Sequence, residues 1–272
     1  MPPMIDRFRE FPRALAEQAR AVRLGDVPVM LAHPNWERPA PVMLWMHGRT
    51  VTKELDPGRY LRMIRAGIGV CAIDLPGHGE RFRPEAQTPA AALEVVATMA
   101  NELDGIVEHL ADVPYGNVFD LDRMGIGGMS AGGMATLIRL CTPHPFAAAC
   151  VEGSSGWLAG LQEAREGGSL AGGWDPALVA RLDPIGRLDG FRPVPILFLH
   201  ASEDAVVPWE VQSRFVDALR ARYSQAGAPH DLIEVVTYPR TGALNEHAGF
   251  GKFSNDAKNA QVDFLARRLG SR

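Results

Sequence analysis

The chain has 272 residues, of which 46% are hydrophobic and 22% charged, and its formal net charge is −4 at pH 7. Such a length fits one large α/β domain or two small ones, and it can bury a sizeable core. A mildly acidic chain with no cluster of lysine and arginine is poorly suited to nucleic acid or to an anionic membrane, so we expect neither as a partner.

Charge placement and cysteine usage indicate the cellular compartment. Charged side chains are spread through residues 1–24, which leaves no uncharged core of a signal peptide. The longest apolar run, residues 41–46, is far shorter than a helix that crosses a bilayer. Cys71, Cys141 and Cys150 lie in apolar segments, as is typical of free buried thiols in a reducing compartment. We therefore expect a cytoplasmic protein, and the oligomeric state stays open.

Hydrophobic periodicity predicts strands and helices in alternation along the chain. The predicted strands span residues 27–32, 42–46, 69–74, 122–126, 147–152, 194–200 and 232–238. The predicted helices span residues 12–24, 59–66, 90–110, 135–140, 209–223 and 254–269. Because the strands are apolar runs without polar alternation, the pattern predicts an α/β fold with a doubly wound, mainly parallel sheet covered by helices on both faces.

Two segments fall outside this alternation. The helix predicted over residues 12–24 makes residues 1–24 an N-terminal helical extension. Residues 157–190 are rich in glycine and contain two tryptophans and short helical pieces, which predicts a small lid or cap. We expect one domain over residues 1–272, with residues 157–190 inserted into it.

The pattern Gly128-x-Ser130-x-Gly132 lies between a predicted strand and a predicted helix. In this context, a serine at the apex of a tight turn presents its hydroxyl at the carboxyl edge of a sheet. Small residues flank it because the turn brings the backbones of strand and helix close together. The motif alone is weak in a chain with 28 glycines, so the prediction of a nucleophile depends on finding a base, an acid and an oxyanion site.

Sheet direction selects the base among eight histidines. Ligands collect at the carboxyl ends of parallel strands, and the strand–turn–serine arrangement expects the order serine, acid, histidine along the chain. His230 and His247 follow the serine and a possible acid. His230 precedes the strand predicted over residues 232–238, so it lies at the wrong end. His247 lies in the loop that leaves the carboxyl end of that strand and is the predicted base.

The acid is expected after the strand predicted over residues 194–200, where Glu203 and Asp204 both qualify. We favour Asp204, because Pro208 then opens the next helix. A carboxylate here would fix the tautomer of the imidazole and stabilise its cation. Glu246, beside His247, is interpreted as a solvated neighbour.

An oxyanion site needs two preorganised N–H donors. The backbone N–H of Ala131 follows the nucleophile, and a second is expected from the loop after the strand at residues 42–46. We predict the Arg49 N–H, with Thr50 as the alternative. Trp157 and Ser154 are the predicted substrate-binding residues, although each has an equally good structural interpretation.

At this point the chain resembles the α/β-hydrolase superfamily, most closely its esterase, dienelactone-hydrolase and prolyl-oligopeptidase-like branch. The resemblance spans roughly residues 40–270 and implies an eight-stranded sheet, a Ser130/Asp204/His247 triad and no cofactor. The chain lacks the propeller domain of prolyl oligopeptidases, and it has serine where dienelactone hydrolases have cysteine. The motifs that carry the resemblance are His47-Gly48, Asp74-Leu75-Pro76-Gly77-His78-Gly79, Asp122 followed by the serine motif, Asp204-x-x-Val-Pro and the late His247.

The function predicted from these residues is a serine hydrolase that cleaves carboxylic esters of small to medium size through an acyl-enzyme. The alternatives are a peptidase, thioesterase or acyltransferase with the same three residues, and a binding protein of the same fold without activity. The sequence contains no Walker, H-E-x-x-H or C-x-x-C motif, so no metal or nucleotide site is predicted.

Overall fold

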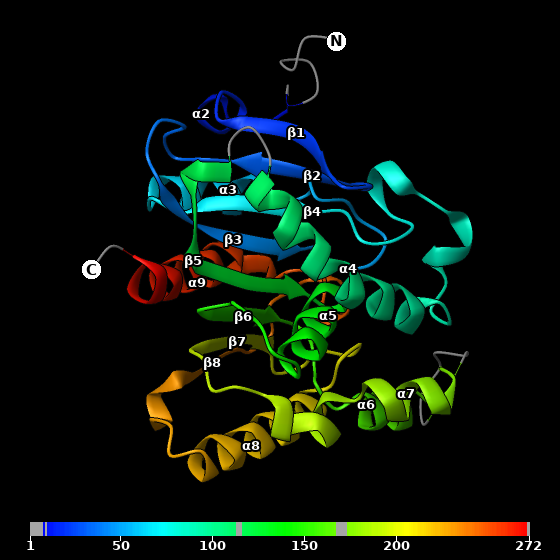
Figure 1. Ribbon diagram of the computed structural model, residues 1–272. Coiled ribbons are helices and arrows are strands. Elements are labelled where there is room, and N and C mark those ends of the chain that lie inside the picture. The colour runs from blue at the N-terminus through cyan, green and yellow to red at the C-terminus, as the bar shows by residue number, and fades with distance from the viewer. Residues whose placement is uncertain (1–7, 9, 113–115, 167–172, 271–272) are drawn as a thin grey trace.

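An eight-stranded sheet forms the centre of the protein in a computed structural model, which describes residues 8, 10–112, 116–166 and 173–270. The strand order is β1-β2-β4-β3-β5-β6-β7-β8, as Figure 1 shows. Strand β2 pairs antiparallel with β1 and with β4, and the other pairs are parallel. The strands are β1 (Ala19–Leu24), β2 (Val27–Ala32), β3 (Ala40–Met46), β4 (Gly69–Ile73), β5 (Phe119–Met129), β6 (Ala148–Glu152), β7 (Ile196–Ala201) and β8 (Ile233–Tyr238).

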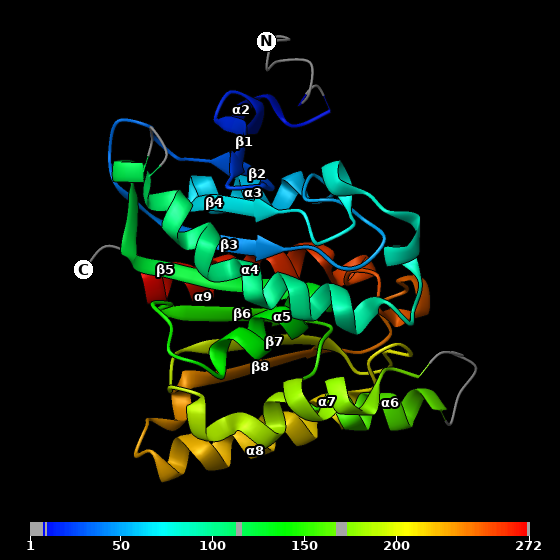
Figure 2. The ribbon, with the colours of Figure 1, turned by 45° about the vertical axis from the view of Figure 1, so that its right-hand side comes forward.

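Helices cover both faces of the sheet, which confirms the doubly wound arrangement. In β3, Val42 and Leu44 pack into one core together with α4, α5 and α8, whereas Met43 and Trp45 pack into a second core with α3 and α9. Figure 2 shows α4 and α9 on opposite sides of the central strands. The helices are α2 (Arg13–Ala16), α3 (Pro57–Arg65), α4 (Ala92–Asp112), α5 (Ala131–Leu140), α6 (Leu158–Glu166), α7 (Pro176–Leu182), α8 (Trp209–Gln225) and α9 (Ser254–Leu269).

The N-terminal helix expected over residues 12–24 is wrong for most of its length. Only the short α2 is helical, and residues 19–24 form the edge strand β1, which pairs with β2 from Ala19 opposite Ala32 to Leu24 opposite Val27. The two-residue turn between them begins at Gly25, whose φ of +56° suits glycine. A Gly-Asp pair between apolar runs is a hairpin signal, and it outweighs the helical spacing of the upstream apolar residues. Residues 1–7 and 9 lie outside the described part of the chain.

Residues 157–190 form α6 and α7, followed by a 3-10 segment, Pro184–Gly190. Asp183 fastens this segment, because its carboxylate accepts hydrogen bonds from the N–H groups of Leu158 and Ala159 at the start of α6 (2.8 and 3.0 Å). The indole of Trp174 donates to the carbonyl of Pro89 at 3.2 Å. Asp183 thus joins the two ends of the predicted lid to each other, and Trp174 attaches its middle to the body of the protein. Its residues 167–172 lie outside the described ranges, and its role as a lid stays a prediction.

The parallel strands all direct their carboxyl ends to one edge of the sheet. The loops after β3, β4, β5, β6, β7 and β8 therefore meet at that edge. No helix within the described residues is long and apolar enough to cross a membrane. The three cysteines are buried and free.

Candidate active site

Ser130 lies at a sharp turn between β5 and α5. Its φ of 52° and ψ of −113° are strained for a residue with a side chain, and such strain is typical of functional sites. The N–H of Ser130 donates to the carbonyl of Glu152, the last residue of the neighbouring β6, at 2.8 Å. The turn is thereby fixed to the sheet, and the half-buried Ser130 lies at its carboxyl edge.

The glycines around Ser130 are required by close contacts with neighbouring backbone. A Cβ added to Gly128 would lie 2.5 Å from the carbonyl carbon of Gly132 and 2.6 Å from the carbonyl oxygen of Met46. A Cβ on Gly132 would collide with the same carbonyl of Met46. Helix α5 begins at Ala131, directly after Ser130. This is four residues before the start predicted at residue 135.

The structure brings Ser130, His247 and Asp204 together in a hydrogen-bonded row. The Nε2 atom of His247 lies 2.9 Å from the Oγ of Ser130, and its Nδ1 atom lies 2.7 Å from the Oδ2 of Asp204. Because a carboxylate only accepts, Nδ1 carries the proton, and Nε2 is free to accept the proton of the serine hydroxyl. This is the geometry that a serine nucleophile and its general base require.

Asp204, and not Glu203, faces His247. Its side chain is 1% exposed, and its Oδ1 atom accepts the N–H groups of Val206 and Val207, both at 2.8 Å. Glu203 points outward and pairs with the exposed Arg240 at 3.1 Å. The two backbone donors hold one carboxylate oxygen, which leaves the other for His247.

A second histidine lies beside the acid without joining the row. His200 is buried at the end of β7, where its Nε2 donates to the carbonyl of Val207 at 2.8 Å and lies 3.8 Å from Oδ2 of Asp204. Burial lowers the pKa of His200, although the charge of Asp204 partly opposes the change. His200 therefore stays neutral near the carboxylate and leaves the Oδ2 atom of Asp204 to the hydrogen bond from His247.

Two backbone N–H groups next to Ser130 are suited to hold an oxyanion. The N–H of Ala131 opens α5, and no described residue accepts a hydrogen bond from it or from the N–H of Arg49. A Cβ on Gly48 would lie 3.6 Å from the Cβ of Ser130, so the Gly48–Arg49 peptide lies directly beside the serine. The Arg49 side chain turns away and donates to the carbonyl of Thr88 at 2.7 Å. An oxyanion role for the N–H groups of Ala131 and Arg49 stays a prediction.

The structure places the two predicted substrate-binding residues differently. Ser154 is fully buried, and a Cβ on Gly133 of α5 would meet its side chain at 2.7 Å, so it packs beneath the helix. Trp157 is half-buried under the guanidinium of Arg214, which lies 4.3 Å from its ring. A substrate contact by either residue stays a prediction.

Gly153 is a site residue that the sequence reasoning missed. A Cβ there would lie 3.4 Å from Cε1 of His247 and 3.6 Å from Oδ2 of Asp204, and the φ of Gly153 is +48°. The backbone after β6 thus forms the floor beneath the imidazole. Its sequence signal was a glycine directly after a buried strand. Within the described ranges, no group of three or more His, Cys, Asp or Glu side chains is placed to hold a metal ion.

Comparison with known proteins places this chain in a family. Residues 63–272 match the model of the prolyl oligopeptidase family. Esterase YjfP of Escherichia coli (strain K12) is 25% identical over 218 residues, which cover 72% of this chain and 82% of the relative. The crystal structure of TT1662 from Thermus thermophilus is 21% identical, with a TM-score of 0.71 over 93% of this chain and 98% of that one. A puromycin-hydrolyzing peptidase of Mycobacterium tuberculosis is also 21% identical, with a TM-score of 0.72 over 93% of this chain but only 40% of its own. Since the family model spans well over half of the chain and the structural neighbours share its fold over nearly all of it, the chain belongs to the prolyl oligopeptidase family, within the α/β-hydrolases.

Proposed function

We propose that this protein is a serine hydrolase that cleaves carboxylic esters of small to medium size through an acyl-enzyme. The observation that carries the proposal is the row Ser130–His247–Asp204, with distances of 2.9 and 2.7 Å at a strained turn. The ester class is supported by the relative named as an esterase. The proposed chemistry needs no cofactor, and the ester itself is the partner.

In the first half-reaction, His247 takes the hydroxyl proton of Ser130 on Nε2 as Oγ attacks the carbonyl carbon of the ester. The negative charge that develops on the carbonyl oxygen is held by the N–H groups of Ala131 and Arg49. His247 then returns the proton to the departing alcohol, and the acyl group stays on Ser130.

In the second half-reaction, water replaces the alcohol. His247 takes one proton from the water, whose oxygen attacks the acyl carbon, and the same two N–H groups hold the oxyanion again. The bond to Oγ breaks, the carboxylic acid leaves, and Ser130 regains its proton from His247. Throughout both halves, Asp204 keeps the imidazole in one tautomer and stabilises its cation.

Peptide-bond cleavage is the second candidate. It is favoured by membership of the prolyl oligopeptidase family and by the likeness to a puromycin-hydrolyzing peptidase. The same groups would act, with an amine as the leaving group that His247 protonates. Thioesters and acyl transfer to an alcohol would also use these groups, and a binding protein of this fold would use none of them.

The test is a panel of p-nitrophenyl esters graded by acyl length, run beside aminoacyl p-nitroanilides, with Ser130→Ala as the control. We expect turnover of the esters and a loss on the order of 10⁶ in kcat for Ser130→Ala, because nucleophile and base act as a unit. A fluorophosphonate probe should label Ser130 in the folded wild type. Absence of labelling would reject the serine hydrolase, and faster turnover of the anilides would favour the peptidase.

A further inference from the structure

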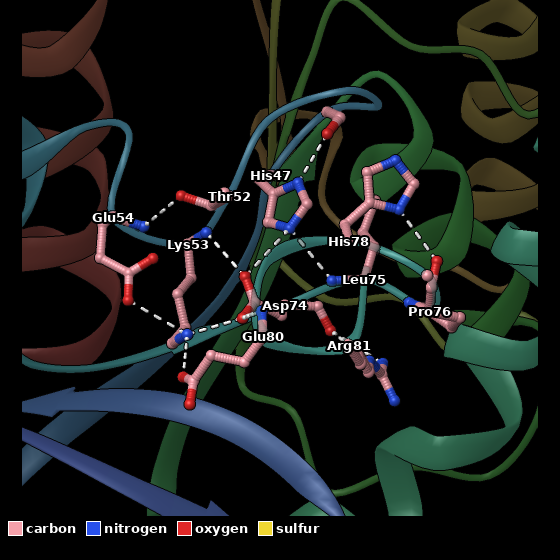
Figure 3. Close-up of polar contacts among 12 residues, drawn as sticks. His47, Thr52, Lys53, Glu54, Asp74, Leu75, Pro76, His78, Glu80 and Arg81 are labelled. Atoms are coloured by element: carbon pink, nitrogen blue, oxygen red, sulfur yellow. Dashed lines mark hydrogen bonds and ion pairs between the residues drawn. The ribbon is translucent and has the colours of Figure 1, made fainter. Parts of the chain in front are cut away.

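A cluster of buried polar side chains lies behind the Gly48–Arg49 peptide. Figure 3 shows it between the loop that follows β3 and the loop that follows β4. His47, Lys53 and Asp74 are all buried, at 4%, 1% and 0% exposure. None of them touches Ser130, His247 or Asp204 in a described contact, so the catalytic scheme above leaves them without a role.

The hydrogen bonds of His47 fix its tautomer. Its Nε2 atom accepts the N–H of Leu75 at 3.0 Å, and a backbone amide can only donate. Nε2 therefore has no proton, and Nδ1 carries it. Nδ1–H donates to the carbonyl oxygen of Gly48 at 2.6 Å. The imidazole thus links the backbone after β4 to the carbonyl of the peptide beside the serine.

Holding that carbonyl also sets the direction of the Arg49 N–H. The carbonyl of Gly48 and the N–H of Arg49 belong to the same planar trans peptide, in which they point in opposite directions. With the carbonyl turned back toward His47, the N–H is directed to the other side. The peptide lies against the serine turn, since a Cβ on Gly48 would lie 2.7 Å from Sδ of Met129 and 3.6 Å from Cβ of Ser130.

Asp74 supports the far end of the same loop. Its Oδ1 atom accepts the N–H of Lys53 at 3.0 Å, and its Oδ2 atom accepts Nζ of Lys53 at 2.6 Å and the N–H of Glu80 at 3.1 Å. Burial disfavours the charge of Lys53, but hydrogen bonds to Asp74 and Glu80 outweigh it and raise the pKa of the amine. Gly79 is required here, because a Cβ would collide with the carboxylate of Asp74.

We propose that His47 is a positioning residue that orients the Gly48–Arg49 peptide for oxyanion binding, and that the buried Lys53–Asp74 pair holds the loop on which it acts. Residues 74 and 75 are the common support, because Asp74 binds Lys53 and the adjacent Leu75 N–H binds His47. This inference rests on the proposed hydrolase function. In it, His47 orients the peptide that binds the oxyanion and takes no part in proton transfer.

Two substitutions at His47 separate the contact with Gly48 from the contact with Leu75. The amide nitrogen of His47→Asn occupies the place of Nδ1 and can still donate to Gly48. The longer His47→Gln reaches the place of Nε2, toward Leu75, and leaves the Gly48 carbonyl without its donor. His78→Gln is the matched control, because His78 is a buried histidine whose side chain donates to the carbonyl of Pro76 (2.9 Å), and none of its described hydrogen bonds reaches Gly48. Its ring lies 5.6 Å from that of His47.

The readout is the ratio of kcat/KM for p-nitrophenyl acetate to that for its thionoester analogue, because sulfur gains far less from N–H donors than oxygen does. For His47→Gln we expect the ester rate to fall on the order of 10²-fold, as for loss of one oxyanion donor, and the ratio to fall with it. His47→Asn and His78→Gln should keep the wild-type ratio. An equal loss on both substrates, or no loss in His47→Gln, would overturn the inference.

Crystal structures of the two His47 variants supply a test that does not require activity. The Gly48–Arg49 peptide should keep its orientation in His47→Asn and rotate or lose order in His47→Gln. An unchanged peptide in His47→Gln would overturn the inference even if the protein proves not to be a hydrolase. Failure of Ser130 to react with a fluorophosphonate would instead reject the proposed function alone.

Discussion

The N–H and hydroxyl groups of Thr241 both donate to the carboxylate of Glu246, at 2.5 and 2.7 Å, and this closes the loop that carries His247. The second carboxylate oxygen accepts the N–H of Gly242 at 2.9 Å. The hydrogen bond from the Thr241 side chain, followed by those from the backbone, lowers the pKa of Glu246. Glu246 is therefore not the acid that orients His247, as the sequence indicated, and this solvent-accessible neighbour of His247 also acts as the clamp of the loop.

Replacement of Glu246 by alanine should reduce activity without unfolding the protein. Asn245 and Glu246 have positive φ values of 54° and 53°, and the clamp keeps the backbone in this conformation next to His247. Release of the loop would misplace the imidazole, and a misplacement of about 1 Å can cost on the order of 10² in rate. We expect kcat for an ester to fall 10- to 10²-fold by this principle, with Glu246→Gln in between because it keeps one acceptor oxygen.

The control for this clamp is Glu203→Ala, which removes an exposed carboxylate of the neighbouring loop that contacts only Arg240 in the described residues. Its kinetics should match the wild type. Equal kcat values for Glu246→Ala and Glu203→Ala would show that the clamp does not position His247.

Asp204→Asn should nearly abolish turnover while the fold is retained. The backbone N–H groups of Val206 and Val207 would keep the amide oxygen where Oδ1 lies, so the NH₂ group would face Nδ1 of His247. The imidazole would then carry its proton on Nε2 and could not accept the proton of Ser130. We expect kcat to fall on the order of 10⁴, which is the effect of replacing the aspartate of a serine protease triad by asparagine.

Steady-state kinetics, with circular dichroism to verify folding, measure this effect. Glu203→Gln serves as the matched change on the adjacent acid and should leave kcat unaltered. If the two variants exchanged these outcomes, Glu203 would be the acid.

Sheet topology allowed the histidine of the candidate site to be predicted, whereas the hydrogen bonds that clamp the local loops could not be predicted. His247 could be selected because the carboxyl edge of a parallel sheet is defined by strand order, and apolar runs reveal the strands. Helix α9, Ser254–Leu269, has the expected bounds. The loop that Glu246 closes has positive φ values at Arg240, Asn245 and Glu246, none of which is a glycine, so the sequence carries no backbone signal for it.

The N-terminal error has a similar origin. The apolar spacing of residues 15, 19 and 22 fits a helix, but the partner strand β2 offers a full ladder of hydrogen bonds to β1. Tertiary pairing overrides a local helical preference of this size. The buried pair Lys53–Asp74 joins two loops that are distant in sequence, so the sequence alone did not predict this contact.

Stability should fall as the pH drops from neutral to about 4.5, because histidines that the fold keeps neutral take up protons when the chain unfolds. Burial, with the nearby Arg192 and Arg139, lowers the pKa of His144 to about 4. The unfolded chain, with a histidine pKa of about 6.5, binds more protons below that pH. The contribution of His144 is therefore complete above pH 6.5 and is lost as the pH falls through the folded value. Burial also lowers the pKa of His33, His78 and His200.

The Tm, measured between pH 7.5 and pH 4.5, reports this dependence. His144→Asn is the informative variant, because its amide oxygen can still accept the hydrogen bond that Arg192 donates to Nδ1 at 3.2 Å. It cannot take up a proton, so its Tm should decline less steeply with pH. A slope identical to that of the wild type would show that His144 does not contribute.

The buried pair of Arg59 and Glu152 should contribute to stability by joining α3 to the sheet under the serine turn. Two guanidinium nitrogens meet the two carboxylate oxygens at 2.5 and 2.9 Å, and the guanidinium lies 4.3 Å from the ring of Trp45. Glu152→Ala would leave the Arg59 cation buried with Asp56 as its remaining acidic partner. Breaking a buried pair in this way costs about 3–5 kcal/mol, so the urea midpoint should fall by more than 1 M at an m-value of about 2 kcal/mol/M.

The matched change is Asp120→Ala, which breaks a half-exposed pair with Arg123 and should cost at most about 1 kcal/mol. Since Glu152 holds Ser130 through its backbone carbonyl and not through its side chain, the fraction of Glu152→Ala that remains folded should still react with a fluorophosphonate. Loss of labelling in folded protein would instead place the Glu152 side chain in the positioning of Ser130.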